Sequence, residues 1–210
     1  MAILHKATLV PSKLELIASY LPQQPWFSPG DTAQTALLGA YRFDDPAGEV
    51  GLETHLVAHA GTVYQVPLSY RGAELPGAEG WLVGTMEHSV LGKRWVYDAC
   101  ADPVYVATLA TAILTGQHGA EQFVEVDGKL EPRPSTAQVQ GNGTHGTALP
   151  ALEPQPPVTA DGITAIDAGE LRLQILRRLD ASWQPGDLTL SGTWEGQEIP
   201  VELASVKTCV

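Results

Sequence analysis

The sequence has little of several features that mark special classes of protein. It contains only two cysteines, Cys100 and Cys209, so neither a disulfide-stapled fold nor a cysteine-rich metal site is favoured. No apolar run approaches the roughly 18 residues of a membrane span. No apolar stretch as long as that of a signal peptide precedes Pro11. We therefore expect a reduced, cytoplasmic protein with no membrane partner.

Basic residues are also scarce. The chain has 12 Lys and Arg against 24 Asp and Glu, which gives a formal net charge of −12. An acidic surface repels phosphate backbones, so we expect no nucleic-acid partner. Among the 210 residues, 44% are hydrophobic and only 17% are charged, which is enough for a sizeable core. The 21 Gly and 16 Pro favour many short strands and turns over long helices.

Two segments have the start and stop signals of short helices. Ser12 and Glu15 have the spacing of a capping box at the start of a helix over residues 13–21. Asp102 and Pro103 begin a second helix, which we expect to end at Gly116. The first helix would bury one apolar face, formed by Leu14, Ile17, Ala18 and Leu21.

Period-two alternation predicts strands over most of the remaining chain. After a loose strand at 2–10, an antiparallel meander is expected at 36–43, 51–58, 62–70 and 80–88. Further strands are expected at 122–126, 137–140, 162–166, 171–179, 188–194 and 198–205, the last two as a hairpin. A proline-rich exposed loop covers 149–158. The fold class is α+β, with antiparallel sheets, two short helices and domains at 1–119 and 120–210.

Three phrases of the sequence are similar to the N-terminal region of bacterial maltokinases. They are Tyr20-Leu-Pro-Gln-Gln-Pro-Trp-Phe27, Val63-Tyr-Gln-Val-Pro-Leu68 and Gly92-Lys-Arg-Trp-Val-Tyr-Asp-Ala-Cys-Ala-Asp-Pro103. The resemblance is clear over about residues 10–125 and faint over 126–180. One departure is Pro25, which stands where the family usually has Arg.

The resemblance implies a fold as well as a function. It implies a cystatin-like cap, followed by a β-rich subdomain like the upper lobe of a kinase. The cap contributes no catalytic group in that family, and we expect the chain to lack the catalytic lobe. The resemblance therefore implies a non-catalytic accessory or regulatory protein with no cofactor. Its partner would be an enzyme of α-glucan (maltose or trehalose) or sugar-phosphate metabolism.

A glycine-rich segment could instead bind a nucleotide. Gly141, Gly143 and Gly146 match the G-x-G-x-x-G pattern, in which backbone N–H groups approach phosphate oxygens. The proline-rich stretch that follows cannot form the helix that a dinucleotide-binding fold requires. In the kinase arrangement a strand with a phosphate-binding Lys follows the glycine loop. Residues 171–178 are similar to the strand that carries this Lys in the maltokinase family, and alignment on Arg177 and Arg178 places Gln174 at its position. We therefore favour a plain loop over a catalytic one.

Other residue groups have simpler interpretations than a reactive site. His55 and His59 would share one face of a strand, but their backbones would lie too far apart for one zinc ion. Two of the carboxylates of Asp44, Asp45 and Glu49 could act as a pair in general acid–base catalysis, yet these residues fit an ordinary turn better. We expect no metal site.

Among the aromatic residues of the first predicted domain, four stand out as candidates for a cluster: Trp26, Phe27, Trp81 and Trp95. The simplest interpretation is that they form its core. The alternative is a platform for stacking sugars, with Trp81 and Trp95 as ligand-binding residues. A small-molecule binding module for a sugar or a nucleotide therefore stays open as a second function, and an enzyme of unrecognised type as a third.

Overall fold

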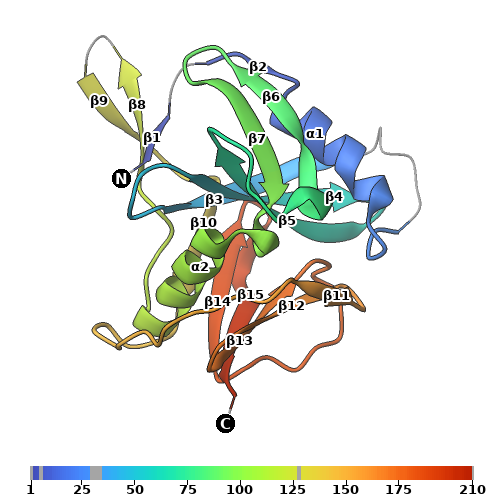
Figure 1. Ribbon diagram of the computed structural model, residues 1–210, viewed down its shortest axis with the longest axis vertical. Coiled ribbons are helices and arrows are strands. Elements are labelled where there is room, and N and C mark those ends of the chain that lie inside the picture. Colours follow the sequence, from blue (N-terminus) through green and yellow to red (C-terminus); the bar gives the residue numbers. More distant parts are fainter. Residues whose placement is uncertain (1, 5–6, 29–34, 127–128, 210) are drawn as a thin grey trace.

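The computed structural model describes residues 2–4, 7–28, 35–126 and 129–209 (Figure 1). In these residues most strands are antiparallel and two α-helices are present. The N-terminal sheet lies in the upper part of the view and the C-terminal sheet in the lower part, with the helix α2 between them. The expected α+β class is confirmed.

The helices and strands fall into groups that the sheets define. The helices are α1 (Lys13–Tyr20) and α2 (Pro103–Thr115), with 3₁₀ turns η1 (Leu21–Gln23), η3 (Glu79–Trp81) and η4 (Ala99–Ala101). The N-terminal sheet contains β2 (Leu9–Val10), β3 (Ala36–Asp44), β4 (Gly51–His59), β5 (Thr62–Arg71), β6 (Leu82–His88) and β7 (Gly92–Asp98). The C-terminal sheet contains β10 (Ala137–Gly141), β11 (Val158–Ala160), β12 (Ile163–Ala168), β13 (Leu171–Leu176), β14 (Leu188–Trp194) and β15 (Gln197–Thr208). A small sheet joins β1 (Ala2–Leu4), β8 (Gln122–Val126) and β9 (Lys129–Arg133).

The N-terminal sheet has the order β2-β6-β7-β5-β4-β3. The meander prediction is right for β3, β4 and β5 but wrong beyond them, because β7 lies between β5 and β6. No strand was expected at the β7 segment. This segment forms a strand because it pairs with β5, for example at Tyr70 and Val96. No local pattern in the sequence shows that long-range pairing.

The C-terminal sheet has the order β10-β14-β15-β13-β12-β11. The predicted terminal hairpin is confirmed, with Trp194 opposite Gln197 across its turn. The proline-rich stretch runs without regular structure into β11, apart from one bridge between Pro154 and Ala168. The short strands β9 and β11 were not predicted.

The predicted strand over residues 2–10 is wrong as a single element. Residues 2–4 pair in parallel with β8, whereas Leu9 and Val10 pair with the end of β6 in another sheet. Residues 5–6, between them, lie outside the described residues. The loose alternation in this segment therefore reflects two short edge strands.

Helix α1 begins with the predicted capping box. The N–H of Glu15 donates to Ser12 Oγ at 3.3 Å, and the N–H of Ser12 donates to Glu15 Oε2 at 2.7 Å. The predicted apolar face is wrong at Leu14, which is 38% exposed. Leu16 and Tyr20 are buried instead, because the face that carries the Tyr20 hydroxyl turns inward to reach Asp98.

Helix α2 has both predicted ends. The N–H of Val104 donates to Asp102 Oδ1 at 3.0 Å, with Pro103 in the first turn. Gly116 closes the helix in the left-handed conformation at φ 68°, which glycine adopts without steric cost. No helix in the described part of the chain is long and apolar enough to cross a membrane.

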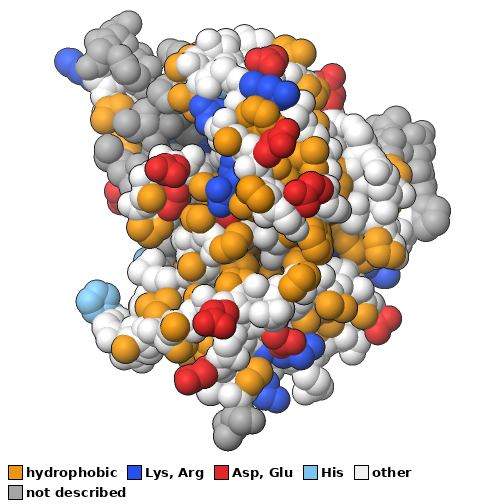
Figure 2. All heavy atoms as spheres, viewed as in Figure 1, with side chains coloured by type: hydrophobic (Ala, Val, Ile, Leu, Met, Phe, Trp, Pro, Cys, Tyr) orange, Lys and Arg blue, Asp and Glu red, His pale blue; other side chains and the backbone are white. Residues whose placement is uncertain are grey.

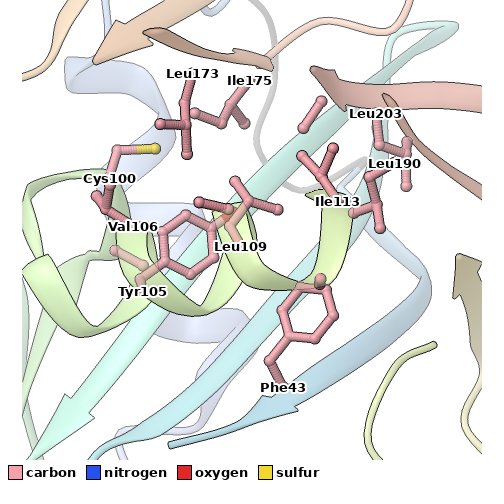
Figure 3. Close-up of a cluster of buried hydrophobic side chains, with 14 of the residues drawn as sticks. Phe43, Cys100, Tyr105, Val106, Leu109, Ile113, Leu173, Ile175, Leu190 and Leu203 are labelled. Atoms are coloured by element: carbon pink, nitrogen blue, oxygen red, sulfur yellow. The ribbon is translucent and has the colours of Figure 1, made fainter. Parts of the chain in front are cut away.

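Two buried clusters hold the layers together. The larger cluster places Tyr105, Leu109 and Ile113 of α2 against strands of the C-terminal sheet, with Phe43 of β3 on the other side of the helix (Figure 3). The smaller one packs α1 and the segment after it on the opposite face of the N-terminal sheet. Truncating a fully buried residue such as Leu109 to Ala would cost about 2–5 kcal/mol. The larger cluster includes residues on both sides of the predicted boundary at 119–120, and the division into two domains stays a prediction.

Candidate functional site

The backbone N–H groups of the glycine-rich loop are already used inside the protein. The N–H of Gly141 donates to Gln117 O at 2.9 Å and that of Gly143 donates to Ile113 O at 3.0 Å. The N–H of Thr144 donates to Leu114 O at 3.0 Å. The loop therefore satisfies carbonyls at the C-terminal end of α2, which would otherwise lack partners.

Close packing explains two of the three glycines. A Cβ at Gly141 would lie 2.1 Å from Ala112 O, and one at Gly143 would lie 2.1 Å from Leu114 O. Gly146, by contrast, has nothing within 4 Å and has φ 84° in a turn. The geometry of Gly141 and Gly143 thus accounts for them without a phosphate, and the assignment of this loop as a ligand site stays a prediction.

The predicted aromatic platform divides into two parts. Trp26 and Phe27 are buried beside Tyr64, with ring centroids 6.0 and 5.0 Å from it. Trp81 and Trp95 are half-buried on η3 and β7, and in the described residues their rings make no aromatic contact with each other. The ammonium of Lys93 lies 4.6 Å from the ring centroid of Trp95. A sugar-binding role for Trp81 and Trp95 stays a prediction.

Gln174, which was expected at the position of the kinase lysine, lies in the middle of the C-terminal sheet. It is half-buried on β13, opposite Ala165 of β12 and Ser205 of β15. Its amide carries no charge to hold a phosphate. Three residues further along, Arg177 provides the buried cation of this region.

Arg177 makes a buried ion pair that the sequence interpretation missed. Its side chain is among the largest that are fully buried, and its Nη2 donates to both carboxylate oxygens of Asp98 at 2.7 and 2.6 Å. Its Nε donates to Thr164 Oγ1 at 2.7 Å, and its guanidinium lies 5.3 Å from the ring centroid of Trp26. The hydroxyl of Tyr20 donates to Asp98 Oδ2 at 2.6 Å.

The pKa values of this group follow from the burial of charge. Burial opposes the charge of Arg177, but Asp98 outweighs it and the pKa of Arg177 is raised. Burial, reinforced by Asp98, raises the pKa of Tyr20. Burial likewise raises the pKa of the Cys100 thiol, which makes it a poor nucleophile. These groups are held in one protonation state near neutral pH, so they suit a structural role better than proton transfer.

A second buried polar contact joins the same two sheets. The Gln65 amide donates to Leu176 O at 2.8 Å and to Leu203 O at 3.0 Å, both in the C-terminal sheet. The same side chain accepts from the Tyr41 hydroxyl at 2.9 Å. The Gln65 N–H donates to Arg177 O at 2.9 Å. Each phrase that carries the maltokinase resemblance therefore supplies a residue to the contacts around Arg177 and Asp98: Tyr20 and Trp26, Gln65, and Asp98 itself.

A separate cluster of ionisable side chains lies between the N-terminal sheet and the start of α1. Glu53, 9% exposed, pairs with Lys13 and lies 3.7 Å from both Arg42 Nη1 and His55 Nε2. Burial raises the pKa of Glu53, but its positive neighbours outweigh burial and lower it to about 2. Burial lowers the pKa of His55 to about 4, despite the opposing effect of Glu53. His55 Nε2 also lies 3.1 Å from the Tyr70 hydroxyl.

Two cavities adjoin this group, and Lys13 lines both. The larger, about 440 Å³, lies between the β3–β4 turn and the β6–β7 hairpin. The smaller, about 250 Å³, lies beside α1 and has Glu53 and His55 in its wall. Neither cavity contains any of the predicted ligand residues. The sequence interpretation missed this group because Arg42 of β3 and Glu53 of β4 come together only when the two strands pair.

The histidines and turn carboxylates have ordinary surroundings. His59 is buried against Phe27, with ring centroids 4.7 Å apart. Asp45 accepts from the N–H groups of Ala47, Glu49 and Val50, as the turn interpretation expects. Within the described residues no group of three or more His, Cys, Asp or Glu side chains could hold a metal ion.

The comparison with known families agrees with the three phrases. Residues 20–102 match the model of the maltokinase N-terminal cap domain. The matched segment starts at the last residue of α1 and ends at the N-cap of α2, so it includes all of β3–β7. No curated protein matches the chain. Over residues 20–102, this chain is therefore similar to the maltokinase N-terminal cap domain.

Proposed function

We propose that this chain acts as a non-catalytic accessory or regulatory module next to an enzyme of α-glucan, maltose or trehalose metabolism. The buried pair of Arg177 and Asp98 supports the proposal most directly. This pair removes the only fully buried arginine among the described residues from any role in phosphate binding. The metabolic setting is taken from the cap family and is an analogy.

The surroundings of the glycine-rich loop support the same conclusion. A phosphate-binding loop needs backbone N–H groups that are free to point at the ligand. Here the N–H groups of Gly141, Asn142, Gly143 and Thr144 all donate to carbonyls of this chain. Binding a triphosphate would therefore require breaking contacts that close the end of α2.

The finer fold assignment belongs to this proposal. The N-terminal sheet, with α1 packed on one face, corresponds to the cystatin-like cap. The C-terminal sheet corresponds to the upper part of a kinase-like fold. The antiparallel order of both sheets and the α1 packing support this assignment. A cytoplasmic location remains a prediction.

Two experiments test the proposal. The first incubates the purified chain with ATP and either maltose or glucosamine and measures phosphorylated sugar. We expect none, and turnover with either acceptor would overturn the non-catalytic role.

The second experiment recovers the tagged chain from its native cell under mild conditions. We expect an enzyme of glucan or sugar-phosphate metabolism among the proteins recovered, and its absence would remove the metabolic assignment.

A small-molecule binding module is the second candidate function. The 440 Å³ cavity favours it, because its volume falls in the range of about 300–1,000 Å³ common to small-molecule sites. Binding without chemistry is compatible with an accessory role, since a ligand would then regulate how the module docks.

A further inference from the structure

The 440 Å³ cavity is bounded by structural elements that fix its shape. The β3–β4 turn forms one side, where the Asp45 carboxylate accepts from three backbone N–H groups. The β6–β7 hairpin forms the other, where Arg94 Nη2 donates to Leu91 O at 2.5 Å. Lys13, at the start of α1, borders the cavity between them. The walls therefore do not depend on a single flexible loop.

Polar groups of both signs reach this cavity. Three permanently charged basic side chains line it, namely Lys13, Arg42 and Arg94, together with the imidazole of His88. Three acidic ones also line it, namely Asp44, Asp45 and Glu49. Figure 2 shows the same mixture more widely, with acidic and basic side chains close together over the N-terminal half. The charges of the lining are nearly balanced.

Arg42, one of the basic residues of this lining, is held in position by an ion pair. Arg42 Nη1 lies 3.7 Å from the carboxylate of Glu53, which Lys13 also contacts. The ring of Tyr70 lies beneath Lys13, with the ammonium 5.4 Å from the ring centroid. Apolar side chains complete the lining, among them Leu9, Phe43, Met86 and Leu91. A rigid donor, nearby acceptors and an apolar wall are thus combined in one cavity.

The charge balance selects the class of ligand. An anion would meet three carboxylates, and a cation would meet two guanidinium groups and an ammonium, so neither is favoured. A hydroxyl can donate to a carboxylate and accept from a guanidinium at once. The C–H faces of such a ligand can pack on the apolar wall. We propose that this cavity binds an uncharged polyhydroxy ligand of monosaccharide or disaccharide size; the proposal deepens and rests on the second candidate function.

Calorimetry with the full chain tests the site, using glucose, maltose and glucose 6-phosphate as probes. We expect heat with a neutral sugar, and weaker or no binding of the phosphate ester. Arg94→Gln removes a cationic donor, so the dissociation constant should rise about tenfold, the effect of losing one charge-assisted hydrogen bond. Glu49→Gln removes the negative charge of an exposed acceptor on the opposite side and should weaken binding in the same direction.

Arg172→Gln is the matched control, because Arg172 is an exposed arginine of β13 that pairs with Asp167 outside the cavity. It should leave the dissociation constant unchanged. Thermal unfolding of each variant checks that it is folded. The proposal would be overturned by no binding of either neutral sugar, or by binding of the phosphate ester alone. It would also be overturned if Arg94→Gln and Glu49→Gln both bound the neutral sugar as tightly as the unsubstituted protein. Phosphoryl transfer by the chain would overturn the accessory role but leave this site standing.

Discussion

The guanidinium of Arg177 donates to both carboxylate oxygens of Asp98, which is 79 residues away in the chain. One residue follows the end of β13 in the C-terminal sheet, and the other ends β7 in the N-terminal sheet. Their ion pair joins the two halves where Tyr20 and Trp26 also meet. The segments of the chain that look like a maltokinase cap are therefore also the segments that hold this fold together.

Asp98→Asn should destabilise the protein strongly. It removes the charge that compensates Arg177, and an uncompensated buried charge costs about 3–5 kcal/mol. Urea unfolding followed by tryptophan fluorescence measures the loss. Asp167→Asn is the control, because its carboxylate is 58% exposed and pairs with Arg172, so it should cost less than about 1 kcal/mol. Equal stability of the two variants would show that the buried pair does not hold the sheets together.

Gly143→Ala tests why the glycine-rich loop contains glycine. The added Cβ would lie 2.1 Å from Leu114 O, so the loop must move away from the end of α2. We expect a loss of about 1–3 kcal/mol, as for other overpacked sites. Gly80→Ala is the control, since nothing lies within 4 Å of its Cβ, and it should change stability by less than about 0.5 kcal/mol. A stable Gly143→Ala variant would contradict the close-packing explanation.

His55 should make the protein less stable as the pH falls from 6.5 toward 4. In the unfolded chain its pKa is the ordinary 6.5, whereas burial beside Lys13 and Arg42 lowers the folded value to about 4, against the pull of Glu53. Between these values the unfolded state binds the extra proton, so stability rises with pH by up to about 1.4 kcal/mol per unit. The pKa of Glu53, about 2, keeps that carboxylate ionised throughout this window.

The measurement is the free energy of unfolding in urea at several pH values across this window. His55→Gln should flatten the slope, because glutamine does not titrate. The control is His145→Gln, at an exposed histidine in the loop after β10. This variant should keep the slope of the unfolding free energy against pH. A slope unchanged in His55→Gln would assign the pH dependence to other groups.

Local patterns in the sequence predicted the elements that depend on neighbouring residues. Both helices start, and α2 also ends, where their capping residues indicate, because Ser12, Asp102 and Gly116 act within a few residues of themselves. Strands β3, β4 and β5 follow from alternation and the turns between them. The family resemblance is also carried by short phrases, and the match to residues 20–102 confirms it.

The sequence alone determined the fold class, the helix ends and the maltokinase cap resemblance, because each is encoded in local composition and spacing. Only the tertiary structure decided that β7 separates β5 from β6, that Arg177 pairs with Asp98, and that Lys13, Arg42 and Glu53 meet beside one cavity. These contacts join residues far apart in the chain. Their formation depends on how sheets pair and layers pack, which no local pattern specifies.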